Sequence, residues 1–340
     1  ESFEFDLITA RFKKGLSSVE KIGSVTVYRI GVGVPILDKL MLPFLGALKI
    51  ASLHSKQRYM YFWAIMVSFA SGAPFIWNGI RSVFGSPRVP IVLTLQEGDS
   101  EEHLTHRRVG LVGLAWRMAL TRADKVTAIS NYLLGHAKVW GFHGQGFLVP
   151  NGVTIEAFSE SVPLEEKKKI RSRWRLSEKD IILVTTSRLT KKNNLESVIR
   201  ALALLPAHIH FIIMGVGEEE HSLHELTSKL DVDKRVHFLG FVSHDQIPSI
   251  LKSSDIFIRP SLSEGMGNSF IEAMAANIPV IATPVGGIVD FLFDPAKNPD
   301  KKSTGLFCEV ENPESIARQV KKYLENPALR EQIILEANSM

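Results

Sequence analysis

The chain has 340 residues, of which 45% are hydrophobic and 22% charged, and it carries one cysteine and a formal net charge of +4. That length exceeds what a single hydrophobic core usually fills, so we expect two domains. The single cysteine, Cys308, excludes a disulfide framework and favours a reducing compartment such as the cytosol. Because basic and acidic residues are interspersed along the chain, the surplus of positive charge does not predict a nucleic-acid partner.

The first part of the chain predicts strands separated by helical segments. Short apolar runs rich in β-branched residues and bounded by turn residues indicate strands. Such runs occupy residues 25–30, 90–96, 125–130 and 146–153. Repeated strand-then-helix units are typical of an α/β domain built on a parallel sheet.

An uncharged segment, Tyr59 to Ile80, lies between Arg58 and Arg81 and is long enough to cross a bilayer. Polar and helix-breaking residues interrupt it, among them Gly72 and Pro74. A buried strand followed by a buried helix leaves the same trace, so we favour that interpretation over a membrane span.

The second part of the chain repeats the strand-and-helix pattern. Strands are expected at residues 181–187, 209–217, 235–241, 256–260 and 279–285. A polar stretch from Gly152 to Glu160 lacks a strand period and predicts the boundary between domains 1–153 and 154–340. The expected fold class is therefore α/β, with two Rossmann-like, doubly wound domains facing across a cleft that binds the ligand.

The stretch from Ser263 to Gly287 combines a buried strand's end, a glycine loop and a helix. Gly265 and Gly267 let backbone approach a ligand, and the free N–H groups of the helix start favour a phosphate. Glu264 and Glu272 flank this point and accept hydrogen bonds from hydroxyls, which indicates a sugar or ribose. The alternative is an ordinary helix capped by Ser263 or Asn268, with Glu272 in solvent.

A second cluster follows the strand at residues 181–187. Arg188 and Lys192 stand where that strand gives way to a helix, and paired cations there would neutralise a diphosphate. An exposed basic turn is the alternative.

At these residues the sequence resembles a known family. The patterns SRLTKKN, HFLGFV, SEGMGNSFIEAMA and PVIATPVGG occur in order and are similar to those of glycosyltransferase family 4. The resemblance implies the GT-B fold and a retaining enzyme, of hexosyltransferase type, that uses a nucleotide-sugar donor. It covers nearly the whole chain and is densest from Thr185 to Asp290.

The resemblance also implies roles for single residues. Glu264 would contact the donor sugar and Glu272 the ribose, while Arg188 and Lys192 would counter the diphosphate charge, with Lys191 as a rival for Lys192. Backbone amides of the loop would bind the diphosphate, from Gly265, Met266, Gly267, Asn268, Ser269 and Phe270. The base would be bordered by Gly215, Gly240, Phe241 and Val242. On the acceptor side of the first domain the candidates are Gln96 and Ser130.

No metal ion and no cofactor are expected, because the cations and the helix start already supply the positive charge that a departing diphosphate needs. Asp231 and Asp233 spell the D-x-D seen in metal-dependent glycosyltransferases of another fold, but their polar surroundings predict a turn. The acids and histidines of Glu101 to His106 have ligand-like spacing without a recognised motif.

The sequence departs from the family pattern in two respects. Gln96 and Glu97 stand where relatives commonly have a histidine. Relatives also begin with a strand, a glycine-rich loop and a helix before the strand that resembles residues 3–10, and they end in a further helix. We therefore expect a partial sequence that folds poorly and transfers little sugar by itself.

The acceptor is expected to be a glycan or a lipid-linked molecule. Apolar residues are frequent in residues 40–53 and 59–77. They could attach the protein peripherally to the inner face of the cell membrane, or they could simply form the hydrophobic core. A GT-B epimerase or phosphorylase and a non-catalytic carbohydrate-binding or membrane-adaptor protein remain alternatives. A dinucleotide-dependent dehydrogenase is excluded, since Glu220 and Phe270 replace the third glycine of G-x-G-x-x-G.

Overall fold

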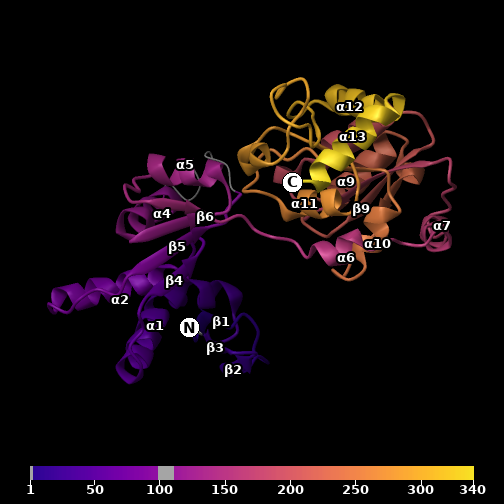
Figure 1. Ribbon diagram of the computed structural model, residues 1–340. Helices are drawn as coiled ribbons and strands as arrows, with labels where there is room; N and C mark the ends of the chain where they lie inside the picture. Colours follow the sequence, from indigo (N-terminus) through magenta and orange to yellow (C-terminus); the bar gives the residue numbers. More distant parts are fainter. Residues whose placement is uncertain (1–2, 99–110) are drawn as a thin grey trace. The chain divides into compact units, whose positions relative to one another are not determined.

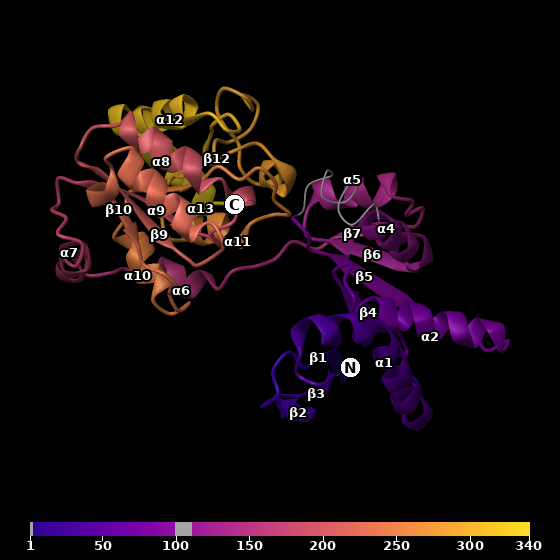
Figure 2. The same ribbon diagram turned by 180° about the vertical axis from the view of Figure 1, so that it is seen from behind.

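The computed structural model describes residues 3–98 and 111–340. The chain divides into two compact units, Glu1–Pro150 and Asn151–Met340, and each is considered by itself. The boundary expected from the sequence, after Val153, lies in the same stretch of chain. Both units combine helices with parallel strands (Figures 1 and 2), so the predicted α/β class is confirmed.

Unit 1 contains two sheets, with the orders β1-β3-β2 and β4-β5-β6-β7. Its strands are β1 (Asp6–Ala10), β2 (Val19–Ile22), β3 (Val25–Ile30), β4 (Phe62–Ile65), β5 (Ile91–Leu95), β6 (Lys125–Ala128) and β7 (Gly146–Leu148). Its helices are α1 (Pro35–Lys56), α2 (Gly72–Val83), α4 (Leu111–Arg122) and α5 (Asn131–Val139). The strands expected from the sequence are confirmed, although their division into two sheets was not predicted.

Close packing of α1 against α2 links the two sheets of unit 1. A Cβ added at Gly46 of α1 would lie 2.8 Å from the Cβ of Ala73 in α2, so only glycine fits at this crossing. Leu42, Ala47 and Ile50 bury the same side of α1.

The uncharged segment from Tyr59 to Ile80 forms β4, a connecting loop and most of α2. The predicted strand and helix are therefore confirmed, but the expected burial is wrong for part of the strand, since Trp63 and Ile65 of β4 are 54% and 48% exposed. Throughout residues 3–98 and 111–340, no helix has the length and apolar character needed to cross a membrane.

Unit 2 is built on one parallel sheet with the strand order β10-β9-β8-β11-β12-β13. The strands are β8 (Ile181–Thr186), β9 (Ile209–Met214), β10 (Val236–Phe238), β11 (Ile256–Arg259), β12 (Val280–Ala282) and β13 (Leu306–Phe307). The α-helices are α6 (Ile155–Ser159), α7 (Leu164–Ser172), α8 (Leu195–Ala203), α9 (Glu220–Lys229), α10 (Ile247–Lys252), α11 (Asn268–Ala275), α12 (Pro313–Glu325) and α13 (Pro327–Asn338). Short 3₁₀ segments are η1 (Lys191–Asn193), η2 (Asp233–Arg235) and η3 (Gly286–Asp290).

The core of unit 2 explains why its strands read as continuous apolar runs. Helices cover the sheet (Figures 1 and 2), so the side chains of its central strands are buried on both sides. The core includes Leu183, Phe211, Ile213, Ile256 and Ile258, each without exposed surface.

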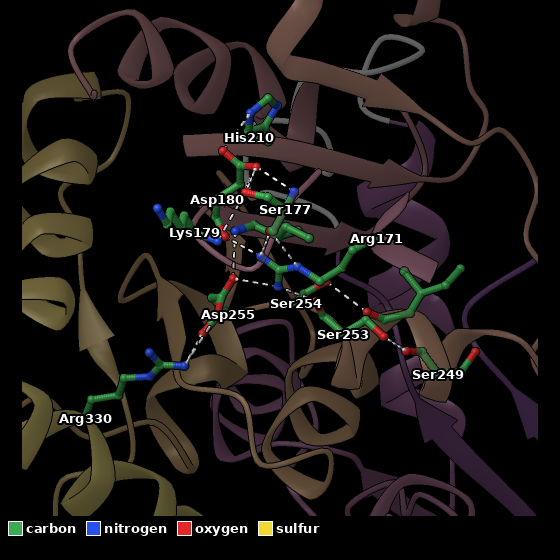
Figure 3. A network of polar contacts seen from close by, with 12 residues as sticks. Arg171, Ser177, Lys179, Asp180, His210, Ser249, Ser253, Ser254, Asp255 and Arg330 are labelled. Carbon is green, nitrogen blue, oxygen red and sulfur yellow. Dashed lines mark hydrogen bonds and ion pairs between the residues drawn. The ribbon is translucent and has the colours of Figure 1, made fainter. Parts of the chain in front are cut away.

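A polar network ties together the amino ends of the central strands (Figure 3). The guanidinium of Arg171 donates to the carbonyl of Ser253 at 3.0 Å and lies 3.4 Å from the carboxylate of Asp255. Asp180, directly before β8, accepts from the amide and hydroxyl of Ser177, each at 2.7 Å. These contacts anchor α7 to the sheet edge and leave the opposite, carboxyl edge for the loops that follow the strands.

Two histidines pack together near the amino edge of the sheet. The rings of His210 in β9 and His237 in β10 are stacked with centroids 5.5 Å apart, and Nδ1 of the first lies 3.3 Å from Nε2 of the second. Burial lowers the pKa of His237, and the neighbouring His210 lowers it further. Burial likewise lowers the pKa of His210, which Asp180 partly opposes.

This pair predicts a loss of stability in mild acid. The folded pKa values lie below the unfolded value of about 6.5, so the unfolded chain binds more protons between them. Stability is therefore fully present above about pH 6.5 and falls as the pH drops through the folded values. We expect urea unfolding to show this loss between about pH 7.5 and pH 5.5, and His237→Gln to reduce it.

The matched control is His221→Gln, because the His221 side chain is 88% exposed. It should leave the pH dependence as in the parent chain. An unchanged pH dependence in His237→Gln would contradict the assignment.

Candidate active site

The candidate site lies where the strand order of unit 2 changes direction. From β8 the chain adds β9 and β10 on one side, and from β11 it adds β12 and β13 on the other. Loops after β8 and β11 therefore leave the sheet next to each other, which is where ligands of doubly wound sheets bind. The amide of Leu262 donates to the carbonyl of Lys192 at 2.7 Å and joins these two loops.

Glu264 is fixed by contacts on both its backbone and its side chain. Its carbonyl accepts from the amide of Gly287 at 3.1 Å. Gly286 has φ of 56°, and a Cβ there would lie 1.8 Å from the same carbonyl, so only glycine allows this close approach. Oε1 accepts from the amide of Gly265 at 3.1 Å, and the side chain is 14% exposed. The carboxylate therefore has a defined direction at the rim of the loop.

Arg259 is a site residue that sequence reasoning missed. This last residue of β11 is nearly buried, and its Nη2 lies 2.7 Å from Oε2 of Glu264. Its Nη1 donates to Oγ of Ser269 at 2.8 Å, and the guanidinium stacks 4.4 Å from the ring centre of Phe270. Burial lowers the pKa of Arg259, whereas Glu264 and Glu272 oppose that shift. The signal in the sequence was a single charge inside the apolar run IFIRP.

The loop from Gly265 to Gly267 ends at the start of α11. Gly267, with φ of 85°, is the residue before the helix and offers no side-chain cap. A Cβ at Gly267 would lie 2.6 Å from the Phe270 ring. The alternative in which Ser263 or Asn268 caps the helix is therefore wrong, and the first-turn amides keep the positive character that attracts anions. The side chains of Met266 and Phe270 are buried, so only their backbone can contact a ligand.

Glu272 lies one turn into α11 and is 12% exposed, so the alternative with this side chain in solvent is wrong. Nε2 of His244 lies 3.3 Å from Oε1 of Glu272, and the His244 ring meets Phe158 edge-on at 5.8 Å. His244 is a second residue that sequence reasoning missed, since it follows HFLGFV without a motif of its own. Because His244 is 68% exposed, its side chain has room to move away and leave Glu272 to accept from a ligand hydroxyl.

The basic loop after β8 is shaped by its backbone. The carbonyl of Arg188 accepts from the Asn193 side chain at 2.7 Å and from the amide of Thr190 at 2.9 Å. The Arg188 side chain is exposed, whereas Lys192 is partly buried and Lys191 is exposed. Through its carbonyl, Lys192 is bonded to the loop that carries Glu264.

The residues expected around the base come from the loops after β9 and β10. The amide of Gly215 donates to the carbonyl of Gly240 at 2.8 Å. A Cβ at Gly215 would lie 1.8 Å from the carbonyl of Ser187, so glycine lets the β8 and β9 loops touch. Phe241 is 81% exposed, and Val242 is partly buried. The structure thus gathers the predicted donor residues of unit 2 along one sheet edge.

The two candidates in unit 1 differ in setting. Gln96 is exposed, and its amide donates to the carboxylate of the buried Glu97 at 2.8 Å. Ser130 is fully buried, and its hydroxyl accepts from the amide of Leu133 at 3.3 Å as the cap of α5. This geometry assigns Ser130 a structural role and does not support its contact with an acceptor.

The structure describes one of the two acidic sequence features. Asp231 lies in a turn with φ of 53° and Asp233 begins η2, as the sequence predicted. The motif from Glu101 to His106 lies outside the described residues. Within residues 3–98 and 111–340, no three His, Cys, Asp or Glu side chains form a group suited to a metal ion.

Comparison with known proteins identifies the family. Residues 166–340 match the family model described as glycosyl transferases group 1, which covers more than half of the 340 residues. The chain therefore belongs to this family. It spans about half the length of the curated relatives it matches.

Three proteins illustrate the similarity. A GDP-mannose-dependent monoacylated alpha-(1-6)-phosphatidylinositol monomannoside mannosyltransferase of Corynebacterium glutamicum is 28% identical over 221 residues, 62% of this chain and 55% of that protein. The sucrose-phosphate synthase of Thermosynechococcus elongatus has a TM-score of 0.81 at 19% identity, covering 98% of this chain and 83% of that one. Anabaena HepE in complex with UDP-glucose has a TM-score of 0.74 at 20% identity, covering 99% and 94%. The predicted GT-B fold is thereby confirmed.

The Arg259–Glu264 pair generates a prediction about stability. Removing one partner of a buried ion pair leaves the other charge uncompensated and costs about 3–5 kcal/mol. We expect Arg259→Met to lower the free energy of unfolding of the full chain by about this amount. Urea unfolding followed by circular dichroism measures it.

A double-mutant cycle provides the control. In a Glu264→Gln background, Arg259→Met should cost clearly less, because the opposite charge is already gone. Equal costs in both backgrounds would show that the two side chains do not interact.

Proposed function

We propose that this protein is a retaining glycosyltransferase of family 4. It moves a sugar from a nucleotide-diphosphate donor to a hydroxyl group of a glycan or lipid-linked acceptor, without a metal ion or other cofactor. The observation that carries the proposal is the arrangement at the carboxyl ends of the neighbouring strands β8 and β11. There the amide-rich start of α11, the carboxylates of Glu264 and Glu272 and the basic loop of Arg188 and Lys192 share one sheet edge.

The chemistry of the step matches these groups. The bond between the anomeric carbon and the phosphate oxygen breaks, and its electron pair leaves with the diphosphate. The acceptor oxygen forms the new bond to the anomeric carbon, and its proton passes to the departing diphosphate. Negative charge thus grows on the diphosphate, and fixed donors aimed at growing charge give the largest catalytic effect. The amides of Gly265 to Phe270, with Arg188 and Lys192, fill this role in the proposal.

The two carboxylates bind the two ends of the donor. Glu264, oriented by Arg259, accepts from hydroxyls of the transferred sugar. Glu272 accepts from the ribose hydroxyls, which replace His244 as its partner. Gly215, Gly240, Phe241 and Val242 border the base, and Gln96 remains the candidate on the acceptor side.

The comparisons support the class of donor. A relative's name specifies GDP-mannose and a similar structure contains UDP-glucose, which are both nucleotide-diphosphate sugars. The proposed location is the cytoplasm, with peripheral attachment to the membrane where the acceptor is lipid-linked. A GT-B epimerase or phosphorylase would bind the same nucleotide or phosphate, but neither would transfer labelled sugar from a nucleotide sugar to an added acceptor hydroxyl.

The cationic loop gives the first test of the proposal. Removing one fixed donor from a growing anion commonly costs about 10²–10³ in kcat. We therefore expect Arg188→Ala to lower transfer of labelled sugar by at least about a hundredfold. A panel of nucleotide diphosphates first identifies the donor, since a hundredfold excess over Kd stabilises the fold by about 2.7 kcal/mol.

Arg200→Ala is the matched control, because Arg200 is an exposed arginine on α8 that pairs with Glu196. It should leave transfer unchanged. If Arg188→Ala transfers sugar at the parent rate, its assigned role is wrong. If the parent chain binds no nucleotide diphosphate, the proposed function itself fails.

A second test should distinguish the roles of Glu264 and Glu272. Glu272→Gln is expected to weaken binding of the nucleoside diphosphate by about tenfold or more, because a charged acceptor of ribose hydroxyls is lost. Glu264→Gln should leave that binding unchanged and instead lower turnover of the nucleotide sugar. Calorimetric titration and a transfer assay measure the two effects. If Glu264→Gln weakened binding and Glu272→Gln lowered only turnover, the roles assigned to the two carboxylates would be reversed.

A further inference from the structure

The ends of the uncharged segment of unit 1 meet at one place in the fold. Arg58 precedes β4, and Arg81 lies in the last turn of α2. Because α2 leads the chain back to the start of β5, a parallel neighbour of β4, its end returns to the amino ends of these strands. Residues 23 positions apart in the sequence therefore line one cavity.

That cavity has a volume of about 730 Å³ and is strongly basic. Its lining contains Lys56, Arg58, Arg81 and Arg88, and among the described residues that line it none is Asp or Glu. Arg81 is held by the carbonyl of Pro87 at 2.9 Å. Arg88 donates to the carbonyl of Arg122 at 2.9 Å and lies 3.6 Å from Asp124, a carboxylate outside the lining.

His54, which also lines the cavity, shows the effect of this charge. Burial lowers the pKa of His54, and the charges of Arg81 and Arg58 lower it further. Both effects disfavour the charged imidazole, so the positive charge of the cavity comes mainly from the lysine and the arginines.

Large apolar side chains are exposed in the cavity lining and within three residues of Arg81 in the sequence. Met60, which lines the cavity, is 77% exposed, while Val83 and Phe84 at the end of α2 are 82% and 78% exposed. In both views α2 extends away from the sheet of β4 to β7 (Figures 1 and 2). Exposed apolar residues next to Lys and Arg are typical of surfaces that settle into the headgroup region of a bilayer.

We propose that this basic-apolar face, formed by Lys56, Arg58, Met60, Arg81, Val83, Phe84 and Arg88, docks on a membrane surface of anionic lipids. Headgroup phosphates enter the cavity, and the three apolar side chains insert among the lipids beside it. A soluble phosphate would account for the cations but not for the apolar side chains. The inference deepens the proposed function, on whose lipid-linked acceptor it rests, by naming the surface that brings the enzyme to its acceptor.

Sedimentation of the full chain with vesicles tests this docking without any sugar transfer. The vesicles contain phosphatidylcholine alone or with about one third phosphatidylglycerol, and each cation near such a surface contributes roughly a fivefold gain in binding. We expect binding to the anionic vesicles only. Lys56→Glu with Arg58→Glu should weaken it by roughly a hundredfold or more. Val83→Ser with Phe84→Ser should weaken it by roughly tenfold, with the salt dependence retained.

Lys169→Glu with Arg173→Glu is the matched control, since both residues are exposed in unit 2 and the change in charge is the same. It should bind vesicles like the parent chain. Equal binding to neutral vesicles, no binding to anionic ones, or an equal loss in the control would overturn the proposal. Release by millimolar pyrophosphate, with no effect of the Val83 and Phe84 changes, would show a site for small anions instead. The vesicle assay contains no sugar donor and measures only membrane binding. Its result therefore stays interpretable even if the protein does not transfer sugar.

Discussion

The ion pair between Arg259 and Glu264 ties the candidate site to the core of unit 2. Arg259 belongs to β11, a strand buried on both sides, so the sheet fixes the position of its guanidinium. Through that group the sheet sets the direction of Glu264 and holds the Ser269 hydroxyl in the first turn of α11. A charge buried at this point costs free energy unless it is paired, and the pairing preorganises the loop that receives the diphosphate in the proposed function.

The two edges of the same sheet carry different kinds of polar contact. At the amino edge, Arg171 donates to backbone carbonyls and pairs with Asp255, so its charge is used in contacts within the fold (Figure 3). At the carboxyl edge lie the start of α11, the carboxylates of Glu264 and Glu272 and the basic loop after β8. Parallel strands produce this division, because every loop that follows a strand emerges on one side.

Unit 1 is organised around α1 and α2 rather than around one continuous sheet. Gly46 permits the helices to touch, and the cations of Lys56, Arg58 and Arg81 collect where the helices end and the strands begin. In the proposed function this unit meets the acceptor, while unit 2 binds the donor. A surface that combines positive charge with exposed apolar side chains fits an enzyme whose acceptor is a lipid.

The sequence by itself determined the α/β class, most strands, the glycine loop and the acidic and basic residues around it, because apolar periodicity and turn chemistry are local properties. The short strands β2 and β13 were not expected. Only the tertiary structure revealed Arg259 and His244, whose partners Glu264 and Glu272 lie 5 and 28 residues away. It also gave Ser130 a capping role and split unit 1 into two sheets. These features depend on which strands pair and which side chains are buried together, and such contacts have no period along the chain.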